Sequence, residues 1–134
     1  MLTQINHIGI AVKSLDEQIP FYRDVLKMKF VGTEEVPEQM VKVAMFQIGE
    51  AKIELLEPTS DDSPIAKYME KKGEGIHHIA YQTDDIQSEI KNIETNDLRM
   101  IDKTPRDGAH DTKIAFIHPK SSGKVLTELT EVKE

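Results

Sequence analysis

Two histidines and two glutamates stand at matching places in the two halves of the chain, and they are the residues best suited to chemistry. His7 and His78 each precede an isoleucine, and Glu54 in KIELLE and Glu128 in VLTELT each interrupt an apolar run. The two histidines are separated by nearly the same length of sequence as the two glutamates. A carboxylate in a central strand is costly unless it is paired or bound to a cation. The four residues are therefore candidates for one shared site.

Two imidazoles and two carboxylates suit a divalent metal ion. The chain has no cysteine, so any metal has to be held by His, Asp and Glu. Such a donor set fits Mn, Co, Ni, Zn or Fe in a five- or six-coordinate site with open positions. A single histidine at a strand start is more often hydrogen-bonded or partly exposed, and a single glutamate in a strand more often faces solvent. The repeated placement is what favours the metal site.

The first half of the chain predicts a strand, a helix and three further strands. Residues 5–12 alternate as a strand does, and Ser14 with Glu17 forms a capping box that opens a helix over about 15–27. Pro20 lies inside this helix, where we expect a local bend. The residues expected on its buried stripe are Leu15, Ile19, Phe21 or Tyr22, Val25 and Leu26. Three strands are predicted over 29–35, 40–49 and 51–58.

The second half repeats this order after a connection over 59–75, in which a short helix is expected to start near Ser63. A strand over 77–83 leads to a helix capped by Asp84 or Asp85. The buried side of this helix is expected to carry Ile86, Ile90 and Ile93. Three further strands are predicted over 98–104, 112–119 and 124–132. Neighbouring strand residues face opposite sides, so only one of His77 and His78 can enter the site. The match of His-Ile with His-Ile selects His78, and His77 is expected to meet the helix layer or solvent.

The repeated order indicates a duplicated α+β fold of the form βαβββ. When the two halves are aligned on His7 and His78, Ile8 matches Ile79 and Leu15 matches Ile86, which favours duplication. We expect one domain over 1–134, with module one over about 4–58 and module two over about 76–131. Each module is too small to bury its own sheet well. Two modules packed side by side would form an open, cupped mixed sheet around a cleft.

The composition excludes several other classes of protein. Net charge is −7, which argues against a general affinity for nucleic acid or anionic membrane. No stretch of the chain is apolar for long enough to form a membrane-spanning helix, and the first residues lack the pattern of a signal peptide. We therefore expect a cytoplasmic protein, and the composition leaves open a small-molecule partner, such as an anion held by a few lysines.

Several motifs together resemble the methylmalonyl-CoA epimerases, a family of the vicinal oxygen chelate superfamily that also contains glyoxalase I. They are HIGIAVKSLDE, PFYRDVL, VPEQ, KIELLEP, DSPIAKY, GEGIHHIAY, PRDGAH and FIHPKSSGKVLTEL. HxGIAV alone marks only the superfamily, whereas the combination is narrower. The resemblance implies paired βαβββ modules around one divalent ion, with Co, Mn, Ni, Zn or Mg as candidates, and the ligands fall on His7, Glu54, His78 and Glu128.

The resemblance also implies the reaction, which is inversion of configuration at C2 of methylmalonyl-CoA, and it implies a homodimer. Removal of the C2 proton creates an enolate, and Glu128 is a candidate for one of the two proton-transfer roles. Some family members have a glutamate in the strand after the VPEQ turn, but here that strand reads QMVKVAMF. Glu38 is near in sequence, although a charge in a turn more often faces solvent. The second proton carrier is therefore open at this point.

Other departures from the family concern glycine and the coenzyme. Related sequences usually have glycine at four positions, which often permits positive φ; this chain has Lys27, Met40, Asp111 and Lys124 there. Candidate contacts for coenzyme A phosphates are Arg106, Lys113, Lys120 and Lys124, and His110 is a candidate pocket residue. The alternatives to an epimerase are a glyoxalase I-type isomerase and a metal-free binding protein on the same fold. Retention of all four candidate ligands disfavours the metal-free protein.

Overall fold

The repeated order of strands and helices is present in a computed structural model, which describes residues 1–133. The first half contains β1 (Leu2–Ala11), α1 (Leu15–Pro20), the π-helix η1 (Phe21–Val25), β2 (Lys29–Val36), the 3₁₀ turn η2 (Pro37–Gln39), β3 (Val41–Ile48) and β4 (Ala51–Pro58). The second half contains α2 (Pro64–Lys72), β5 (Gly75–Thr83), α3 (Ile86–Thr95), β6 (Arg106–Gly108), β7 (Thr112–Ile117) and β8 (Thr127–Val132). No helix of the described chain is both long and apolar enough to span a membrane.

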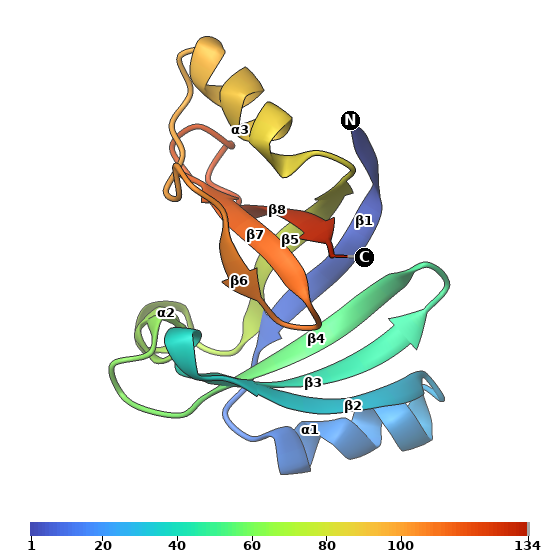
Figure 1. Ribbon diagram of the computed structural model, residues 1–134. Helices are drawn as coiled ribbons and strands as arrows, with labels where there is room; N and C mark the ends of the chain where they lie inside the picture. Colours follow the sequence, from blue (N-terminus) through green and yellow to red (C-terminus); the bar gives the residue numbers. More distant parts are fainter. Residues whose placement is uncertain (134) are drawn as a thin grey trace. The chain divides into compact units, whose positions relative to one another are not determined.

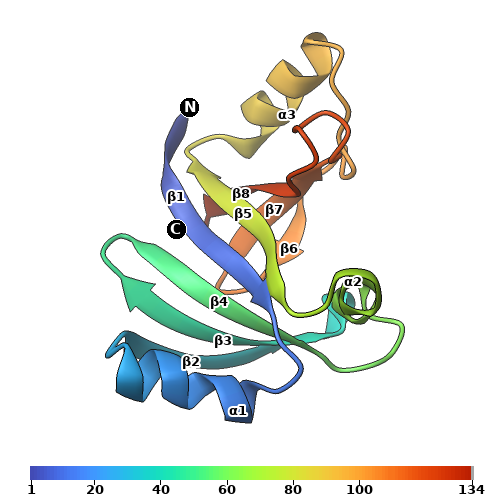
Figure 2. The same cartoon turned by 180° about the vertical axis from the view of Figure 1, so that it is seen from behind.

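The chain divides into two compact units that share strand β1. One unit is residues 7–77, and the other is residues 1–6 together with the chain from residue 78 onward. The strand order is β2-β3-β4-β1 in the first and β1-β5-β8-β7-β6 in the second. Each unit contains one parallel pair, β1 with β4 or β5 with β8, beside antiparallel neighbours. Figures 1 and 2 show these strands from two sides. The predicted α+β class with a mixed sheet and a repeated βαβββ order is confirmed.

Helix α1 covers one face of the sheet in the unit of residues 7–77 (Figure 1). The core of this unit is built from alternate residues of the strands and from residues of the helix. Its buried members are Val12, Leu15, Ala44, Phe46 and Leu55, and Ile10, Ile19, Tyr22, Met28, Phe30 and Ile53 pack against them. Ile53 and Leu55 therefore face the helix. Glu54 lies between them and faces the opposite side of the sheet, as the alternation of strand residues predicted.

The predicted bend at Pro20 is a change of helix type. Helix α1 ends there, and the next turn is π-helical, with the Leu26 N–H donating to the Phe21 carbonyl five residues earlier at 2.9 Å. Tyr22 in this turn and Met28 after it pack against the core, whereas Val25 and Leu26 between them point away from it. Val25 and Leu26 are consequently 67% and 46% exposed, so their predicted burial is wrong, whereas that of Leu15 is confirmed.

Helix α3 occupies the equivalent position in the second unit. It packs on β7 and β8 through a buried cluster of Ile86, Ile90, Met100, Ala115, Ile117 and Leu129, with Ile93 against it. Asp85 is the N-cap, and its carboxylate accepts hydrogen bonds from the Ser88 hydroxyl and amide, which lowers the Asp85 pKa.

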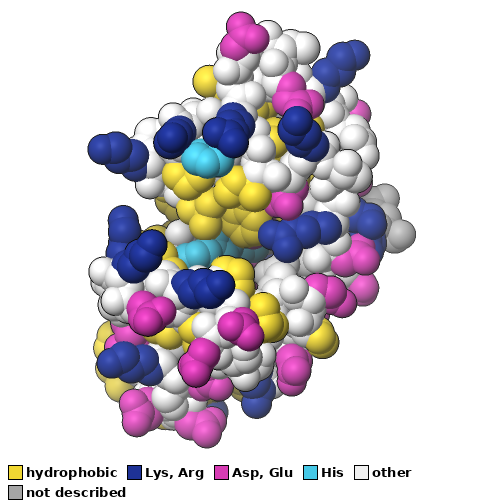
Figure 3. Space-filling model, turned by 90° about the vertical axis from the view of Figure 1, so that its left-hand side faces the viewer, with side chains coloured by type: hydrophobic (Ala, Val, Ile, Leu, Met, Phe, Trp, Pro, Cys, Tyr) yellow, Lys and Arg dark blue, Asp and Glu magenta, His cyan; other side chains and the backbone are white. Residues whose placement is uncertain are grey.

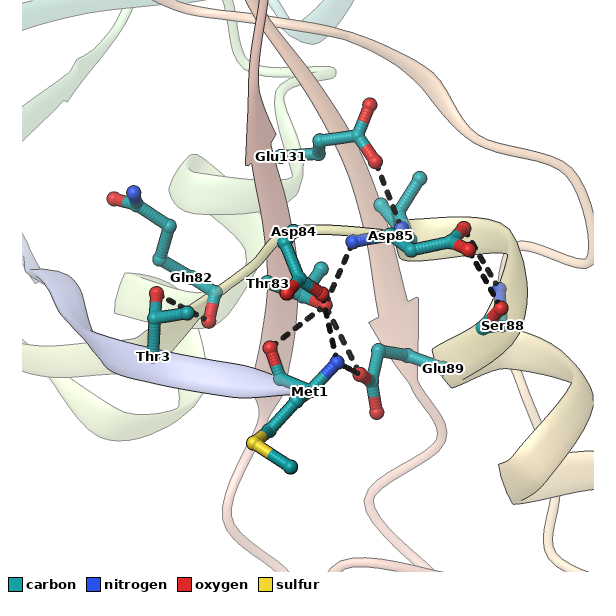
Figure 4. A network of polar contacts seen from close by, with 10 residues as sticks. Met1, Thr3, Gln82, Thr83, Asp84, Asp85, Ser88, Glu89 and Glu131 are labelled. Atoms are coloured by element: carbon teal, nitrogen blue, oxygen red, sulfur yellow. Dashed lines mark hydrogen bonds and ion pairs between the residues drawn. The ribbon is translucent and has the colours of Figure 1, made fainter.

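Figure 4 shows the neighbouring network, in which Asp84 and Glu89 raise the pKa of the Met1 amino group to about 10.

The last strand of each module anchors that module's helix through a glutamate. The Leu15 N–H at the start of α1 donates to Glu57 Oε1 at 2.8 Å, and the Ile86 N–H at the start of α3 donates to Glu131 Oε1 at 2.9 Å. Both are orphan donors of a helix N-terminus. The separation in sequence between these two acids equals that between Glu54 and Glu128. The repeat thus extends from the core to the side-chain hydrogen bonds.

The strand predicted over 98–104 is wrong. Only Met100 forms an isolated bridge there, to Ile117, and β6 lies later, at Arg106–Gly108. The Asp102 carboxylate accepts the Phe116 N–H at 2.9 Å, where a strand would offer a backbone carbonyl. Pro105 follows and has no N–H to donate. Asp102 and Pro105 therefore prevent a regular hydrogen-bonded strand from forming over 98–104.

The four positions at which related sequences usually have glycine all adopt left-handed backbone conformations. The φ angles are 62° at Lys27, 51° at Met40, 52° at Asp111 and 71° at Lys124. The reason inferred for glycine at these positions, a positive φ, is therefore confirmed. Non-glycine residues in this region are strained.

Candidate metal centre

His7 and Glu54 form a buried pair in the unit of residues 7–77. His7 comes from β1 and Glu54 from the neighbouring β4, and Gly9 is the residue directly beside Glu54 in the parallel register. His7 Nδ1 lies 3.2 Å from Glu54 Oε2, and the two residues are only 6% and 7% exposed. The sequence therefore brings this predicted pair together on the face of the sheet away from α1.

His78 and Glu128 form the equivalent pair in the second unit. Ala80 of β5 lies beside Glu128 of β8 in the same parallel register that places Gly9 beside Glu54. His78 Nε2 lies 3.2 Å from Glu128 Oε1, and the two residues are 5% and 3% exposed. Each unit thus carries one imidazole and one carboxylate with the same origin in the repeat.

A hydroxyl group supports Glu128 and has no counterpart beside Glu54. The buried Thr130 lies two residues further along β8 and donates its Oγ1 hydrogen to Glu128 Oε2 at 2.5 Å. The equivalent residue two positions after Glu54 is Leu56. Sequence reasoning did not identify Thr130, although a polar residue on the same face of an otherwise buried strand was a usable signal. The two carboxylates of the repeat are consequently in different environments.

The surroundings of His78 are aromatic and cationic. The Phe116 ring meets the His78 ring edge to face, with the ring centroids 5.5 Å apart. The Arg106 guanidinium lies 5.7 Å from the Phe116 ring centroid, and its Nε lies 3.3 Å from Asp102 Oδ1. A guanidinium over an aromatic face is attracted by the ring quadrupole. Arg106, a sequence-predicted coenzyme contact, is therefore held in place beside the His78 pair.

The other candidate residues lie in more exposed places of the same unit. Lys113 Nζ is 2.9 Å from Asp107, whose pKa is lowered to about 2 by hydrogen bonds from Lys133 and Lys113. Lys120, Lys124 and His110 are exposed. Figure 3 shows several Lys and Arg side chains gathered around a histidine in its upper part.

His77 does not belong to either pair. Its ring packs edge to face against Tyr68 of α2, with the centroids 4.8 Å apart, and the Tyr68 hydroxyl donates to the Ile76 carbonyl at 2.7 Å. The expectation that His77 meets the helix layer is confirmed. His78 is the histidine of this adjacent pair that lies beside Glu128.

The donor chemistry of the two pairs fits a divalent metal. Burying an ionised carboxylate is costly unless a cation or hydrogen bonds compensate, and each carboxylate here has a histidine nitrogen beside it. Neutral imidazole and carboxylate are ligands of Zn, Mn, Co and Ni. Each pair supplies one nitrogen and one oxygen donor of this kind.

Comparison with known proteins agrees with this description of the fold. The model of the glyoxalase/bleomycin resistance protein/dioxygenase superfamily matches residues 6–116. A structure of Streptomyces coelicolor methylmalonyl-CoA epimerase in complex with 2-nitronate-propionyl-CoA is 40% identical, with a TM-score of 0.94, and the match covers 98% of this chain and 96% of that one.

The chain belongs to the methylmalonyl-CoA epimerase family. Two curated relatives support this membership. The mitochondrial methylmalonyl-CoA epimerase of Homo sapiens is 35% identical over 131 residues, covering 97% of this chain and 74% of that protein. The ethylmalonyl-CoA/methylmalonyl-CoA epimerase of Cereibacter sphaeroides is 34% identical over 134 residues, covering 98% of this chain and 100% of that protein. The epimerase resemblance drawn from the sequence motifs is therefore confirmed at the level of the family.

Proposed function

We propose that this protein is a metal-dependent isomerase that interconverts (R)- and (S)-methylmalonyl-CoA. The observation that carries the proposal is the repeated, buried His–Glu pair, one in each unit, in a chain whose relatives are named methylmalonyl-CoA epimerases. An enolate reaction needs stabilisation of negative charge in a water-poor site. A buried set of imidazoles and carboxylates is able to hold the metal ion that provides it.

The proposed ligands are His7, Glu54, His78 and Glu128, and the proposed ion is Co, Mn, Ni, Zn or Mg. When bound, the ion would act as a Lewis acid toward the oxygens of the substrate. The chain's own residues orient the donors. The Thr130 hydroxyl occupies Glu128 Oε2, while Glu128 Oε1 faces His78. Phe116 packs against the His78 ring and limits its rotation.

Glu128 is also the proposed acid or base on one face of the substrate. Proton transfer by a positioned carboxylate contributes roughly 10²–10⁴-fold to a rate. Glu128 arises from a central strand and is held on two sides, so its carboxylate is well positioned for this role. The proton passes between C2 and a carboxylate oxygen, and the electron pair of the C2–H bond moves into the enolate.

The remaining parts of the proposal concern partners and location. Arg106, Lys120 and Lys124 are proposed to contact the phosphates of coenzyme A, since cations hold phosphate oxygens. Lys113 is a weaker candidate because Asp107 already engages it. We also propose a cytoplasmic homodimer, which size-exclusion chromatography with light scattering would test.

Deuterium incorporation at C2 of methylmalonyl-CoA in D₂O tests the proposed function directly. Purified protein is assayed as isolated, after chelation, and after readdition of single metals. We expect exchange and epimerisation that the chelator abolishes and a metal restores. Absence of metal-dependent exchange would refute the proposal. Turnover of a glutathione hemithioacetal in place of methylmalonyl-CoA would instead assign a glyoxalase I-type activity.

A matched pair of variants tests the role of Glu128. Glu128→Gln is expected to lose at least about 100-fold in epimerisation, as for removal of a general acid or base. Glu131→Gln is the control on the same strand, since its amide oxygen still accepts the Ile86 N–H. Equal activity of the two variants would remove Glu128 from the proposed chemistry.

A further inference from the structure

Inversion at C2 needs a proton carrier on each face of the substrate, and the strand in which some relatives place the second carrier has no acidic residue on the relevant face. Val41, Val43 and Met45 of β3 are all buried there. Glu38 is exposed in the turn η2, so it is poorly placed for this role. The structure points to a different glutamate.

A β-bulge in β2 turns Glu34 toward the face that carries Glu54. The pairing of β2 with β3 slips between Phe30 and Gly32: Phe30 lies opposite Phe46, whereas Gly32 lies opposite Met45. Directly opposite residues share a face, so Phe30 faces α1 and Gly32 faces away from it. Gly32 has a φ of 138°, which favours glycine. Without the slip, Glu34 would face α1.

The register places Glu34 in a row of side chains next to the row of Glu54. Glu34 lies opposite Val43, which lies opposite Leu56. Met45 lies opposite Glu54 in the adjacent row of the same face. Two strand spacings and two residues along the strand separate the Cα atoms of Glu34 and Glu54 by about 12 Å. Both side chains leave the sheet on the same side, so a small acyl group can lie between their carboxylates.

Glu34 differs from the neighbouring Glu35 in its burial and in the face of the sheet on which it lies. Glu34 is half-buried, with apolar Val43 and Leu56 in its row, whereas Glu35 is exposed and lies opposite Lys42 on the other face. Among the described residues of β1 to β4, Glu34 and Glu54 are the carboxylates on this face from residue 7 onward. Glu54 is the proposed metal ligand, which leaves Glu34 for proton transfer.

We propose that Glu34 is the second proton-transfer residue, acting on the face of the substrate opposite Glu128. The inference rests on the proposed epimerase function. In one direction the Glu34 carboxylate takes the C2 proton, and the C2–H electron pair enters the C1–C2 bond and the thioester oxygen. Protonated Glu128 then returns a proton to the other face of C2. After this turnover Glu34 is protonated and Glu128 is ionised. A turnover in the reverse direction, or proton exchange with water, restores the starting protonation states, so no reagent is consumed.

Exchange and inversion measured separately on each epimer test this proposal with the metal-loaded enzyme. Glu34→Gln is expected to lose at least about 100-fold in epimerisation. One epimer should still incorporate deuterium with retained configuration, because Glu128 serves its face. The other epimer should lose exchange. Glu35→Gln is the matched control and should behave as the unaltered enzyme, while Glu34→Asp should recover part of the lost inversion.

Each alternative outcome has a defined meaning. Inversion by Glu34→Gln within a few-fold of the unaltered enzyme would overturn the assignment. Loss of exchange from both epimers, with metal content and melting temperature unchanged, would also overturn it, because one face should remain active. A lack of epimerisation by the unaltered enzyme would refute the proposed function itself, which keeps the two failures distinguishable.

Discussion

Replacing Lys27 by glycine is expected to stabilise the protein. Lys27 follows the π-helical turn with a φ of 62°. The N–H groups of its neighbours Leu26 and Met28 close the turn onto the Phe21 and Tyr22 carbonyls at 2.9 and 3.0 Å. A residue in this conformation after a helix end is commonly glycine, since the absence of Cβ removes the steric penalty. The lysine retains that penalty, and its side chain is exposed.

The expected gain follows from two opposing contributions. A non-glycine residue in the left-handed region costs about 1–2 kcal/mol, and glycine costs about 0.5–1 kcal/mol in additional backbone entropy. The net stabilisation is therefore roughly 0.5–1 kcal/mol. For a chain of 134 residues, the unfolding entropy of about 0.28 kcal/mol/K converts this gain into a rise in Tm of about 2–4 °C. Adding Lys124→Gly in the other unit should roughly double it.

Urea unfolding and calorimetry of the single and double variants provide the measurement. Lys91→Gly is the control, because Lys91 is exposed inside α3. Glycine in a helix interior should destabilise by roughly 0.5–1 kcal/mol. The reasoning would be refuted if Lys27→Gly lowered the Tm, or if the control shifted it in the same direction and by the same amount.

Three further predictions concern packing, a buried hydrogen bond and pH. Gly108→Ala should destabilise the protein by roughly 1–3 kcal/mol in urea unfolding, because an added Cβ would lie 2.7 Å from Ile114 Cγ2. Thr130→Val should cost about 1–3 kcal/mol in metal-free protein, since Glu128 loses a buried donor; Thr130→Ser should retain most of that stability. The pKa of Asp107 is lowered to about 2 from its usual 3.8. Its ion pairs therefore contribute stability that is fully present above pH 4 and is lost as the pH falls through 2. An NMR titration in which Asp107 keeps its usual pKa would contradict this.

The sequence predicted the elements and the pairing within each module because both depend on alternation and on the repeat. Opposite faces for Glu54 and Leu55 follow from the two-residue period of a strand. The choice of His78 over His77 required the match between the two halves. Both inferences use only spacing, which the fold preserves. The joint role of the four residues as ligands of one metal ion stays a prediction.

The failures arise where side chains or backbone defects override the period. The Asp102 carboxylate replaces a backbone acceptor and ends a strand that its apolar neighbours favoured. The π-helical turn after Pro20 rotates Val25 out of the stripe. No prediction was made for Glu34: the bulge before Gly32 reverses the face on which it lies, and a glycine within a strand was the only visible signal of that bulge.

The division of β1 between the two units sets an order for folding during synthesis. Residues 7–77 are contiguous, whereas residues 1–6 belong with the chain from residue 78 onward. Translation of residues 7–77 takes about 4–14 s at typical rates. Through this interval the first half of β1, with Leu2 and Ile5, has no β5 beside it. Residues 1–6 therefore wait for a partner strand that is synthesised about 70 residues later, and until then they form an exposed strand edge.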